Sequence, residues 1–379
     1  MLLNLIIWLP LLGSLTLLLG WGGRNVAIAL AGIPLALLVP LFGQFDQGEA
    51  GIQFRMDWQW LPQVGLNYSL GIDSLSLLLL ALSSLLTLMA ILSTEPDIKR
   101  PSLFYGLILL TGGAVNGAFA AQNLLLFFVF YELVLIPIYL LISIWGSNKR
   151  EYAGIKFLIY TAVSAIFLLG AFLGIYWLGD PHSFDLADLG NLGLSPTLQG
   201  LLLIAIIIAF GIKMPLVPLH TWLPDAYGEA SAPVAILLGG ILSKLGTYGL
   251  FRFGLQLFPQ AWAASAGFLA WWGAVAVLTG ALTAIAQKDI KRMVAYSSIG
   301  HMGYILLGMS AATTISLTGV VLQMISHGLI LALLFDAVGL VERKVGTRDL
   351  DVLNGLLNPI RGLPTVSALL ILGGMASAG

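Results

Sequence analysis

Long apolar runs recur along the whole chain, and they constrain its fold more than any other feature. Of the 379 residues, 59% are hydrophobic and only 9% are charged, whereas soluble domains carry about 25% charged residues. Apolar runs of about 18 or more residues are long enough to cross a bilayer as helices. The alternating segments of about 10 residues that build membrane barrels do not occur. The sequence therefore predicts an all-α polytopic membrane protein.

The apolar runs predict eleven complete transmembrane helices and the start of a twelfth. The eleven expected spans, in chain order, are 2–19, 25–42, 70–93, 102–120, 123–145, 153–178, 199–224, 233–257, 262–286, 294–311 and 315–340. The twelfth begins near Leu363 and still runs at Gly379, so we expect a span that is cut short. Residues 44–67 form an aromatic and polar segment that suits a membrane interface.

Lysine and arginine gather in the loops on one side of the predicted bundle, which we call the basic side. Twelve of the 17 lie there, and one, Arg55, lies in the opposite loops. The twelve are Arg24, Lys99, Arg100, Lys149, Arg150, Lys288, Lys291, Arg292, Arg343, Lys344, Arg348 and Arg361. By the positive-inside rule, the basic side faces the cytoplasm or its equivalent. The loop at 225–232 belongs to this side by parity but holds no lysine or arginine.

Three ionisable residues interrupt the apolar runs, and all three are predicted to lie near one level of the bilayer. Lys213 lies 12 residues before Asp225, at the basic end of its span. Lys244 lies 11 residues into the eighth span, and Glu132 lies nine residues into the fifth. At about 1.5 Å per residue these positions are roughly 18, 16 and 14 Å deep. Each group costs about 3 kcal/mol to place there, which favours a functional role.

A glutamate and two lysines in an apolar layer suit proton transfer. Desolvation favours the neutral form of each group, and a nearby opposite charge favours the charged form. A Glu–Lys pair can therefore take up or release a proton as it opens and closes. Pro215 and Pro218 follow Lys213 and free backbone carbonyls that can bind water. The alternative is a buried salt bridge that only fixes helix packing.

Histidines supply further candidates, because a neutral histidine can carry protons stepwise. His220 lies two helical turns after Lys213 toward the basic side, and His301 and His327 lie within the tenth and eleventh spans. Asp336, four residues before the expected end of the eleventh span, is an interfacial candidate. The alternatives are hydrogen bonds between helices and, for His301 and His327, ligation of a haem.

No pattern in the sequence indicates a cofactor or a metal bound to this chain. There are no cysteines, which excludes disulfides, thiolate metal sites and iron–sulfur ligation. No glycine-rich phosphate loop follows a strand pattern, so no nucleotide site is predicted. Lipids are expected around the apolar spans, and no nucleic-acid partner is expected.

Five motifs are spread along the chain, and the resemblance that they carry extends over nearly all of it. They are LGIDSLS at 70–76, FFVFYELVLIPIYLLISIWG at 127–146, FGIKMPLVPLHTWLPDAYGEASAPVAILLGGILSKLGTYGLFRF at 210–253, QKDIKRMVAYSSIGHMGY at 287–304 and LQMISHGLILALLF at 322–335. Together they resemble the antiporter-like, proton-pumping membrane subunits of respiratory complex I. The pattern is most similar to the chain 4 type, which includes the D subunit of cyanobacterial and plastid NAD(P)H–plastoquinone complexes.

The resemblance implies a fourteen-helix fold with two inverted repeats, each containing a broken helix. It assigns 1–100 to three N-terminal helices, 101–258 to the first repeat with its break in the seventh span, and 259–379 to an incomplete second repeat. The same resemblance implies proton-transfer roles for Glu132, Lys213 and Lys244, and relay roles for His301 and His327. The charged residue of the family's twelfth helix has no position in this sequence.

The function that the resemblance implies is proton translocation within an NAD(P)H- or ferredoxin-driven (plasto)quinone oxidoreductase. NAD(P)H or ferredoxin, iron–sulfur clusters and quinone are then expected on other subunits. Further antiporter-like subunits are expected partners, in a cyanobacterial or plastid thylakoid membrane or in a bacterial inner membrane. A subunit of a multi-subunit cation/proton antiporter, a quinone- or haem-binding redox subunit, and a scaffold remain as alternatives.

Two positions depart from the family pattern close to the loop at 225–232. Many members have a histidine where this chain has Tyr227, and another where it has Ala235. We expect both positions, together with Asp225, at the mouth of the access path on the basic side. The departures are consistent with a specialised variant, such as those tied to CO2 uptake.

Overall fold

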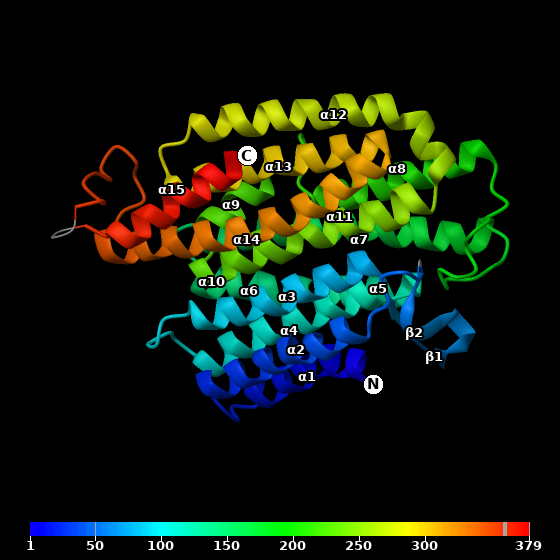
Figure 1. Cartoon of the computed structure of the whole chain (residues 1–379), viewed down its shortest axis with the longest axis horizontal. Helices are drawn as coiled ribbons and strands as arrows, with labels where there is room; N and C mark the ends of the chain where they lie inside the picture. Colours follow the sequence, from blue (N-terminus) through cyan, green and yellow to red (C-terminus); the bar gives the residue numbers. More distant parts are fainter. Residues whose placement is uncertain (50, 359–361, 379) are drawn as a thin grey trace.

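Membrane-length helices lie side by side in the computed structural model, which describes residues 1–49, 51–358 and 362–378 (Figure 1). Within these residues, nine helical spans are long and apolar enough to cross a membrane, and two shorter apolar helices accompany them. The predicted class, an all-α polytopic membrane protein, is therefore confirmed. Arg361 of the expected basic loop lies outside the described residues.

The chain also contains one two-stranded sheet, one short 3₁₀ turn (η1) and two π-helical segments (η2 and η3). The α-helices are α1 (Leu2–Leu18), α2 (Arg24–Gln44), α3 (Ser74–Leu92), α4 (Pro101–Ala120), α5 (Leu124–Leu133), α6 (Leu135–Trp145), α7 (Arg150–Leu178), α8 (Pro196–Lys213), α9 (Trp222–Glu229), α10 (Ala232–Leu237), α11 (Ser243–Gly249), α12 (Pro259–Ile285), α13 (Ile290–Ala311), α14 (Thr314–Val345) and α15 (Pro364–Ala378). The other elements are β1 (Gln53–Leu61), η1 (Pro62–Val64), β2 (Leu66–Ile72), η2 (Leu238–Leu242) and η3 (Leu250–Gln256). The expected spans differ from these mainly at the sheet and at the helix breaks.

The aromatic segment expected at 44–67 forms a β-hairpin. β1 and β2 pair antiparallel, with Trp58 opposite Tyr68, and Gly65 takes the left-handed conformation (φ 68°) in the turn between them. The second strand continues beyond residue 70, where the third span was expected to begin. That expected start is wrong because Asp73 accepts a hydrogen bond from the N–H of Ser76 at 2.9 Å and so caps α3 only from Ser74 onward.

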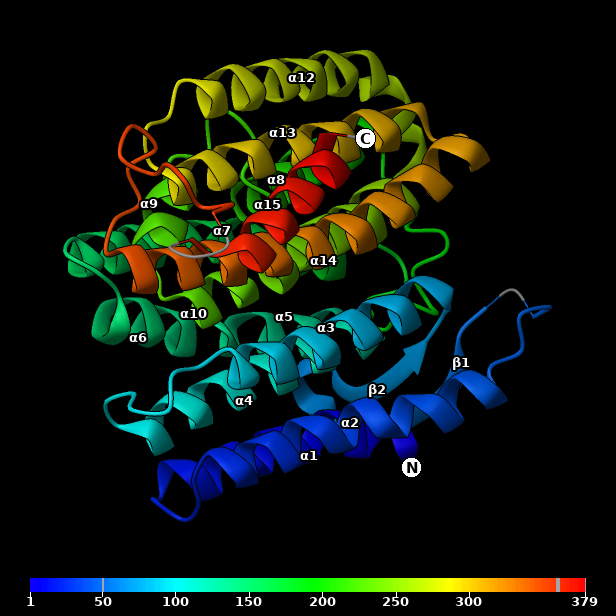
Figure 2. The same ribbon diagram turned by 60° about the vertical axis from the view of Figure 1, so that its left-hand side comes forward.

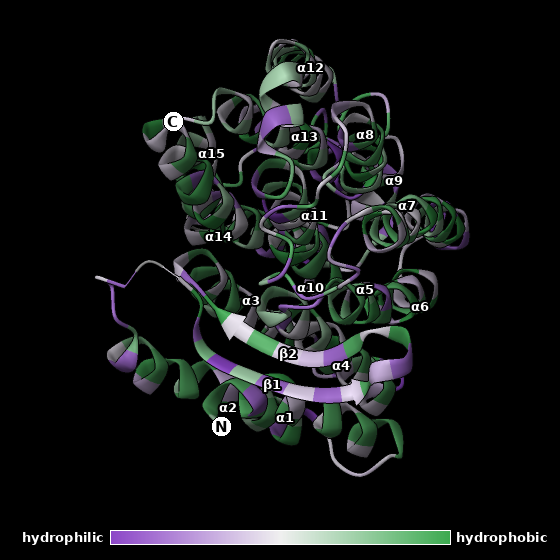
Figure 3. Cartoon of the chain, turned by 90° about the vertical axis from the view of Figure 1, so that its right-hand side faces the viewer, coloured by the Kyte–Doolittle hydropathy of each residue, from purple (hydrophilic) through white to green (hydrophobic). Residues whose placement is uncertain are grey.

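The hairpin lies across one end of the helix bundle, which we call the hairpin side (Figure 3). Tyr68 fastens it to α1, because its hydroxyl accepts a hydrogen bond from Trp8 Nε1 at 2.7 Å and donates one to Asn4 Oδ1 at 2.8 Å. Burial raises the pKa of Tyr68, so the hydroxyl keeps the proton that it donates. The basic loops lie at the opposite end of the bundle (Figure 1).

The span expected at 123–145 consists of two helices, α5 and α6, that separate at Val134. Pro137 has no N–H to donate to the carbonyl of Leu133, so the helical hydrogen-bond ladder loses a rung next to the separation. The sequence did not predict this break. It leaves Glu132 in the last turn of α5, at an interruption of the backbone.

The span expected at 199–224 is broken, as predicted. α8 ends at Lys213, and residues 214–221 are not helical. Pro215 and Pro218 lie in this segment, where neither can donate a backbone hydrogen bond. The break therefore places Lys213 at a helix C-terminus.

The seventh span was expected to end at Pro224, and that end is wrong. Pro224 lies in the first turn of α9. A proline is tolerated in the first turn of a helix, where its missing N–H is not needed. The helix consequently continues to Glu229, and the loop expected at 225–232 shrinks to Ala230 and Ser231.

A single buried span lies at the centre of the bundle, and we call it the central helix. It comprises α10, η2, α11 and η3 (Ala232–Gln256), and its membrane-length window is completely buried inside the protein. It packs against α3, α8 and α14 (Figure 2). Both π-helical segments lie within it, on either side of α11, which carries Lys244.

Glycines allow α12 and α13 to pack backbone against backbone. A Cβ atom added to Gly303 would lie 2.7 Å from the carbonyl oxygen of Gly273, and one added to Gly273 would lie 2.9 Å from that of Gly303. These distances are shorter than real Cβ atoms tolerate. The two helices can therefore approach this closely only with glycine at both positions.

We expect the substitution Gly303→Ala to destabilise the protein by about 1–3 kcal/mol, the usual cost of overpacking. Thermal unfolding in detergent would then begin several degrees lower than for the parent. Gly267→Ala is the matched control, because this glycine lies in α12 and an added Cβ would meet nothing within 4 Å. Equal unfolding temperatures for the two variants would contradict the packing argument.

Candidate functional site

Lys213 is completely buried, and its ammonium group has no hydrogen-bond partner among the described residues. Its Nζ lies 4.2 Å from the centroid of the Tyr131 ring, a cation–π contact. Tyr131 is held in place because its hydroxyl contacts Ser164 Oγ at 2.8 Å. The Ser164 hydroxyl in turn donates to the carbonyl of Ala209 at 2.8 Å. The aromatic ring therefore supports the charge without a hydrogen bond.

The backbone around the break after Lys213 is satisfied by indole groups. Trp222 Nε1 donates to the carbonyl of Ile212 at 2.9 Å, and Trp272 Nε1 donates to the carbonyl of Val217. In an apolar layer a free carbonyl is costly, so non-helical backbone needs such partners. The two tryptophans keep the break stable and leave the end of α8 fixed beside Lys213.

Glu132 is the acidic group that interacts with Lys213. The two charges interact electrostatically, yet no ion pair within 4.0 Å joins them among the described residues. Glu132 Oε1 is buried and also lacks a hydrogen-bond partner in the described part of the chain. Glu132 and Lys213 thus form an open pair, in which each group retains a free position for a proton donor or acceptor.

Lys244, by contrast, is fully partnered. Its Nζ lies 2.7 Å from the carbonyl oxygen of Gly239, 3.3 Å from Ser243 Oγ and 2.6 Å from His327 Nδ1. Gly239 lies in the π-helical segment η2, where the wider turn leaves its carbonyl open to side-chain donors. The π segment therefore creates the acceptor that lets an ammonium group be buried completely.

The contact between Lys244 and His327 can hold a proton on either side. When Lys244 is an ammonium group it can only donate, so Nδ1 of His327 accepts and the ring carries its proton on Nε2. When Lys244 is a neutral amine, the direction can reverse. His327 Nε2 is buried without a partner among the described residues, which leaves that nitrogen available for a further transfer.

His301 continues the row from His327. The two rings lie 4.9 Å apart between centroids. His301 Nδ1 lies 2.9 Å from the Gln323 amide nitrogen, and Nε2 lies 2.8 Å from Ser377 Oγ. Both histidines line a cavity of about 280 Å³ with Tyr304, Gln323, Ser326 and Ser377. A polar cavity of this size can hold water that bridges the two rings.

Gly246 brings the Lys244 helix against the end of α8. A Cβ atom added here would lie 2.8 Å from the backbone nitrogen of Met214 and 3.0 Å from the carbonyl carbon of Lys213. The backbone of α11 therefore touches the backbone at the break. This contact sets the separation between the open Glu132–Lys213 pair and Lys244.

His220 does not lie where the sequence argument placed it. The spacing of two helical turns from Lys213 assumed a continuous helix, but the chain between them is not helical. The same interruption invalidates the depth count from Asp225. His220 Nδ1 is buried and has no hydrogen-bond partner among the described residues, so it remains a candidate by its burial and not by its helical face.

Tyr227 and Asp225 are not open at the mouth of an access path. Tyr227 is fully buried, and its hydroxyl donates to the carbonyl of Leu238 at 2.9 Å, in η2. Asp225 forms ion pairs with Lys156 at 2.8 Å and with Arg292, which tie α9 to α7 and α13. The expectation fails because both residues lie within α9 instead of a loop.

Asp336 is less exposed than an interfacial residue would be. α14 continues to Val345, five residues beyond the expected end, so Asp336 lies well inside the helix. Ser93, at the end of α3, donates a hydrogen bond to its carboxylate. The contact joins α14 to α3 and does not connect Asp336 to His327.

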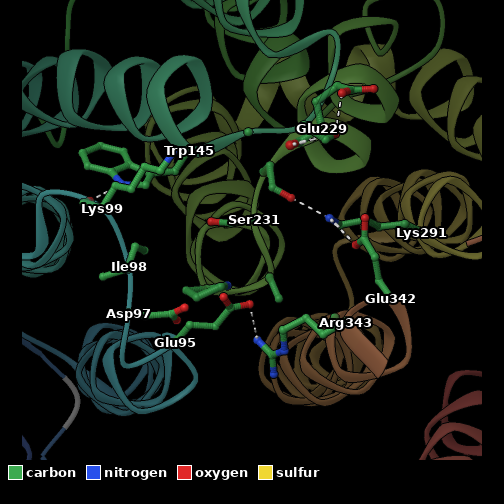
Figure 4. A pocket seen from close by; sticks show the side chains of 16 residues that line it. Glu95, Asp97, Ile98, Lys99, Trp145, Glu229, Ser231, Lys291, Glu342 and Arg343 are labelled. Carbon is green, nitrogen blue, oxygen red and sulfur yellow. Dashed lines mark hydrogen bonds and ion pairs between the residues drawn. The ribbon is translucent and has the colours of Figure 1, made fainter. Parts of the chain in front are cut away.

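A pocket of about 490 Å³ opens on the basic side (Figure 4). Its walls carry acidic and basic groups from four segments: Glu95, Asp97, Lys99, Glu229, Lys291, Glu342 and Arg343. Lys291 Nζ donates to the carbonyl of Ala230 at 2.6 Å and lies 3.5 Å from Glu342 Oε2. The short loop between α9 and α10 has no lysine or arginine of its own, and Lys291 of α13 places a positive charge against it.

Several of these groups could not be found from the sequence. Tyr131 adjoins Glu132 in an aromatic run, but nothing in that run predicts its contact with Lys213. The π segment η2 has a partial signal in the paired Gly239 and Gly240 before Lys244. Within the described part of the chain, no group of three or more His, Asp or Glu side chains could hold a metal ion.

Comparison with known families places this site in context. The sequence profile described as NADH:quinone oxidoreductase/Mrp antiporter, TM matches residues 121–379. NAD(P)H-quinone oxidoreductase chain 4 1 of Synechococcus elongatus is 45% identical over 98% of this chain and 70% of its own length. NAD(P)H-quinone oxidoreductase chain 4 3 of Trichormus variabilis is 44% identical over 94% of this chain. This chain spans only 65% of the length of that relative.

Solved structures of large membrane complexes share the fold. A chain of respiratory complex I from Thermus thermophilus with bound NADH matches all of this chain and 86% of its own, with a TM-score of 0.88 and 29% identity. A chain of the Mrp complex from Dietzia sp. also matches all of this chain, covers 70% of its own, and has a TM-score of 0.89 at 26% identity.

We expect Gly246→Ala to push α11 away from the break and to lower both stability and proton translocation. The added methyl group meets backbone atoms, which cannot yield as a flexible side chain would, at an expected cost of about 1–3 kcal/mol. Gly170→Ala in α7 is the control, since a Cβ atom there would meet nothing within 4 Å. The prediction fails if Gly246→Ala unfolds and functions like the control in thermal melts and vesicle assays.

Proposed function

The chain belongs to the NADH:quinone oxidoreductase/Mrp antiporter transmembrane family, and from that premise we propose that it is a proton-translocating membrane subunit. The complex it serves is an NAD(P)H- or ferredoxin-driven (plasto)quinone oxidoreductase. The observation that carries the proposal is the direct contact of two buried proton carriers, Lys244 Nζ and His327 Nδ1, at 2.6 Å. Apolar side chains would pack these positions more cheaply than ionisable groups that cost several kcal/mol to bury.

The first part of the route is the open pair of Glu132 and Lys213. While Glu132 is charged and close, it stabilises the ammonium form of Lys213; when the two separate, desolvation favours release of the proton. Tyr131 supports the charge by its ring and leaves all three ammonium hydrogens free. Lys213 can therefore pass a proton on without breaking a hydrogen bond first.

The second part of the route begins at Lys244. A proton that reaches this amine can cross the 2.6 Å contact to His327 Nδ1, and the ring can release another proton from Nε2 into the cavity shared with His301. This is the stepwise relay for which a histidine is suited. We propose the proton-transfer roles that the family resemblance implies for five residues: Glu132, Lys213, Lys244, His301 and His327. A supporting role for His220 is part of the same proposal.

The inlet of the route is the pocket on the basic side. Ser231, Ala232 and Pro233 of the pocket wall begin the central helix, which leads directly to Lys244. Acidic groups in its wall, Glu95 and Glu342 among them, pair with Arg343 and Lys291 and make the mouth polar enough to hold water. Tyr227, buried in α9 just before the inlet loop, donates its hydroxyl to the carbonyl of Leu238 in η2.

The redox chemistry belongs to other subunits. NAD(P)H or ferredoxin, iron–sulfur clusters and quinone bind elsewhere in the complex, and this chain couples to them through neighbouring antiporter-like membrane subunits. Its cyanobacterial relatives favour a thylakoid membrane, with the basic side facing the cytoplasm or stroma.

A subunit of a cation/proton antiporter is the second candidate, because the chain of the Mrp complex matches the fold as well as that of complex I does. The two differ in their partners. Affinity purification from mild detergent, followed by a test for NAD(P)H- or ferredoxin-dependent quinone reduction, separates them. A haem between His301 and His327 is not favoured, because the two rings contact each other and leave no space for a porphyrin.

Lys213→Ala is expected to lower proton translocation at least tenfold, a modest part of the roughly 10²–10⁴-fold effect of a positioned acid–base group. The complex should still assemble, because the alanine removes a buried charge and no hydrogen bond. Lys288→Ala is the control, since that lysine is 79% exposed on the basic side. Dye-reported acidification of vesicles with the purified complex gives the measurement, and parental pumping by Lys213→Ala would refute the role.

His327→Gln is expected to lower the number of protons moved per electron while the complex remains intact. The glutamine carbonyl can still accept from Lys244, but an amide cannot take up and release a proton. His182→Gln is the matched control, as His182 is exposed in a loop on the hairpin side. An unchanged ratio of protons to electrons in His327→Gln would exclude His327 from the route.

A further inference from the structure

Polar side chains follow Lys244 along the central helix toward the hairpin side. Tyr248 lies one turn further along the central helix, and Arg252 lies one turn beyond that. The Tyr248 hydroxyl donates to the carbonyl of Phe119 at 3.1 Å, contacts Ser76 Oγ at 3.2 Å and accepts from Arg252 Nε at 3.3 Å. Tyr248, Ser76 and Arg252 thus form a hydrogen-bonded cluster that begins one helical turn after Lys244 and extends toward the hairpin side.

This cluster ends at a pocket of about 360 Å³ on the hairpin side. Arg252 and Gln256 of the central helix line it, together with Gln122 and Arg55. The pocket is reached from the side of the membrane opposite the inlet. The Tyr248 hydroxyl lies between this pocket and the level of Lys244, and water passing along these polar groups would provide a proton leak unless something blocks it.

Arg252 lies between the hairpin-side pocket and the Tyr248 hydroxyl. Only 11% of its side chain is exposed, and it forms an ion pair with Asp73, the residue that caps α3. Its remaining donors bind Gln256 Oε1 at 3.0 Å and approach Ser76 Oγ at 3.5 Å. Asp73 is occupied as well, because its other oxygen accepts from the N–H of Ser76.

We propose that Arg252 is a fixed-charge seal that prevents protons from passing between Lys244 and the hairpin-side pocket, so that they leave Lys244 only through His327. A guanidinium group does not lose its proton in proteins, so it cannot take part in a relay. Its positive charge also repels an arriving proton, as a pore arginine does in channels that exclude cations. The inference rests on the proposed proton-translocating function.

The test measures passive proton entry into vesicles that hold the purified complex and a trapped pH dye, with a potassium diffusion potential and no electron donor. Arg252→Gln is expected to raise the rate about tenfold or more, the factor that corresponds to about 1.4 kcal/mol of barrier. Arg252→Lys, which keeps the charge, should stay close to the parent. Arg55→Gln is the matched control, because Arg55 lines the same pocket but is 48% exposed.

A double variant separates a specific leak from damaged packing. If the leak runs through the Tyr248 hydroxyl, Tyr248→Phe combined with Arg252→Gln should return the vesicles toward parental tightness. If Arg252→Gln is not recovered in the complex, Arg252→His serves in its place, because a histidine can relay protons near neutral pH. Vesicles as tight as the parent with either variant would overturn the seal, and so would a leak that persists in the double variant.

Pumping by the parent complex keeps this test apart from the proposed function. A parent that moves no protons on addition of the electron donor contradicts the proposed function itself. A parent that pumps, together with Arg252→Gln vesicles that stay tight and pump equally, contradicts only the seal.

Discussion

The burial of two ammonium groups in an apolar bundle is the constraint on which the rest of the structure depends. Lys244 meets it with three polar contacts, of which the carbonyl of Gly239 is available because the helix widens into a π segment. Lys213 meets it with an aromatic ring and an electrostatic partner that stays out of hydrogen-bond contact. Lys244 is therefore fully hydrogen-bonded, whereas the ammonium hydrogens of Lys213 have no acceptor among the described residues.

Irregular backbone is the means by which these charges are accommodated. The break after Lys213, the separation of α5 and α6 beside Glu132, and the π segments around Lys244 all lie at membrane depth. Each exposes carbonyl groups that lipid cannot satisfy, so side chains do so instead. Trp222 donates a hydrogen bond to a carbonyl at the end of α8, and Tyr227 donates one to a carbonyl of η2. Functional groups and backbone irregularities thus coincide because each needs the other.

The two ends of the bundle differ in how open their polar pockets are toward the central helix. On the basic side, ionic groups surround an open pocket that leads toward the start of the central helix. On the hairpin side, Arg252 lines a smaller pocket and forms an ion pair with Asp73. A proton pump must open to each side of the membrane at different times. A permanent path through Lys244 would let protons flow back down their gradient. The asymmetry of the two ends fits this requirement.

The class of the fold, its sidedness, the broken seventh span and the ionisable residues could all be predicted from the sequence. Hydrophobic length, loop charge and proline position are local properties, and each acts through a short segment. The hairpin, the π segments and the partners of the charges could not be predicted. Tyr131 reaches Lys213, and His327 reaches Lys244, only because helices distant in the chain pack together. The sequence alone determined which residues would be costly to bury, and only the tertiary structure decided how each is stabilised, because desolvated charges depend on atoms that the chain brings close by folding.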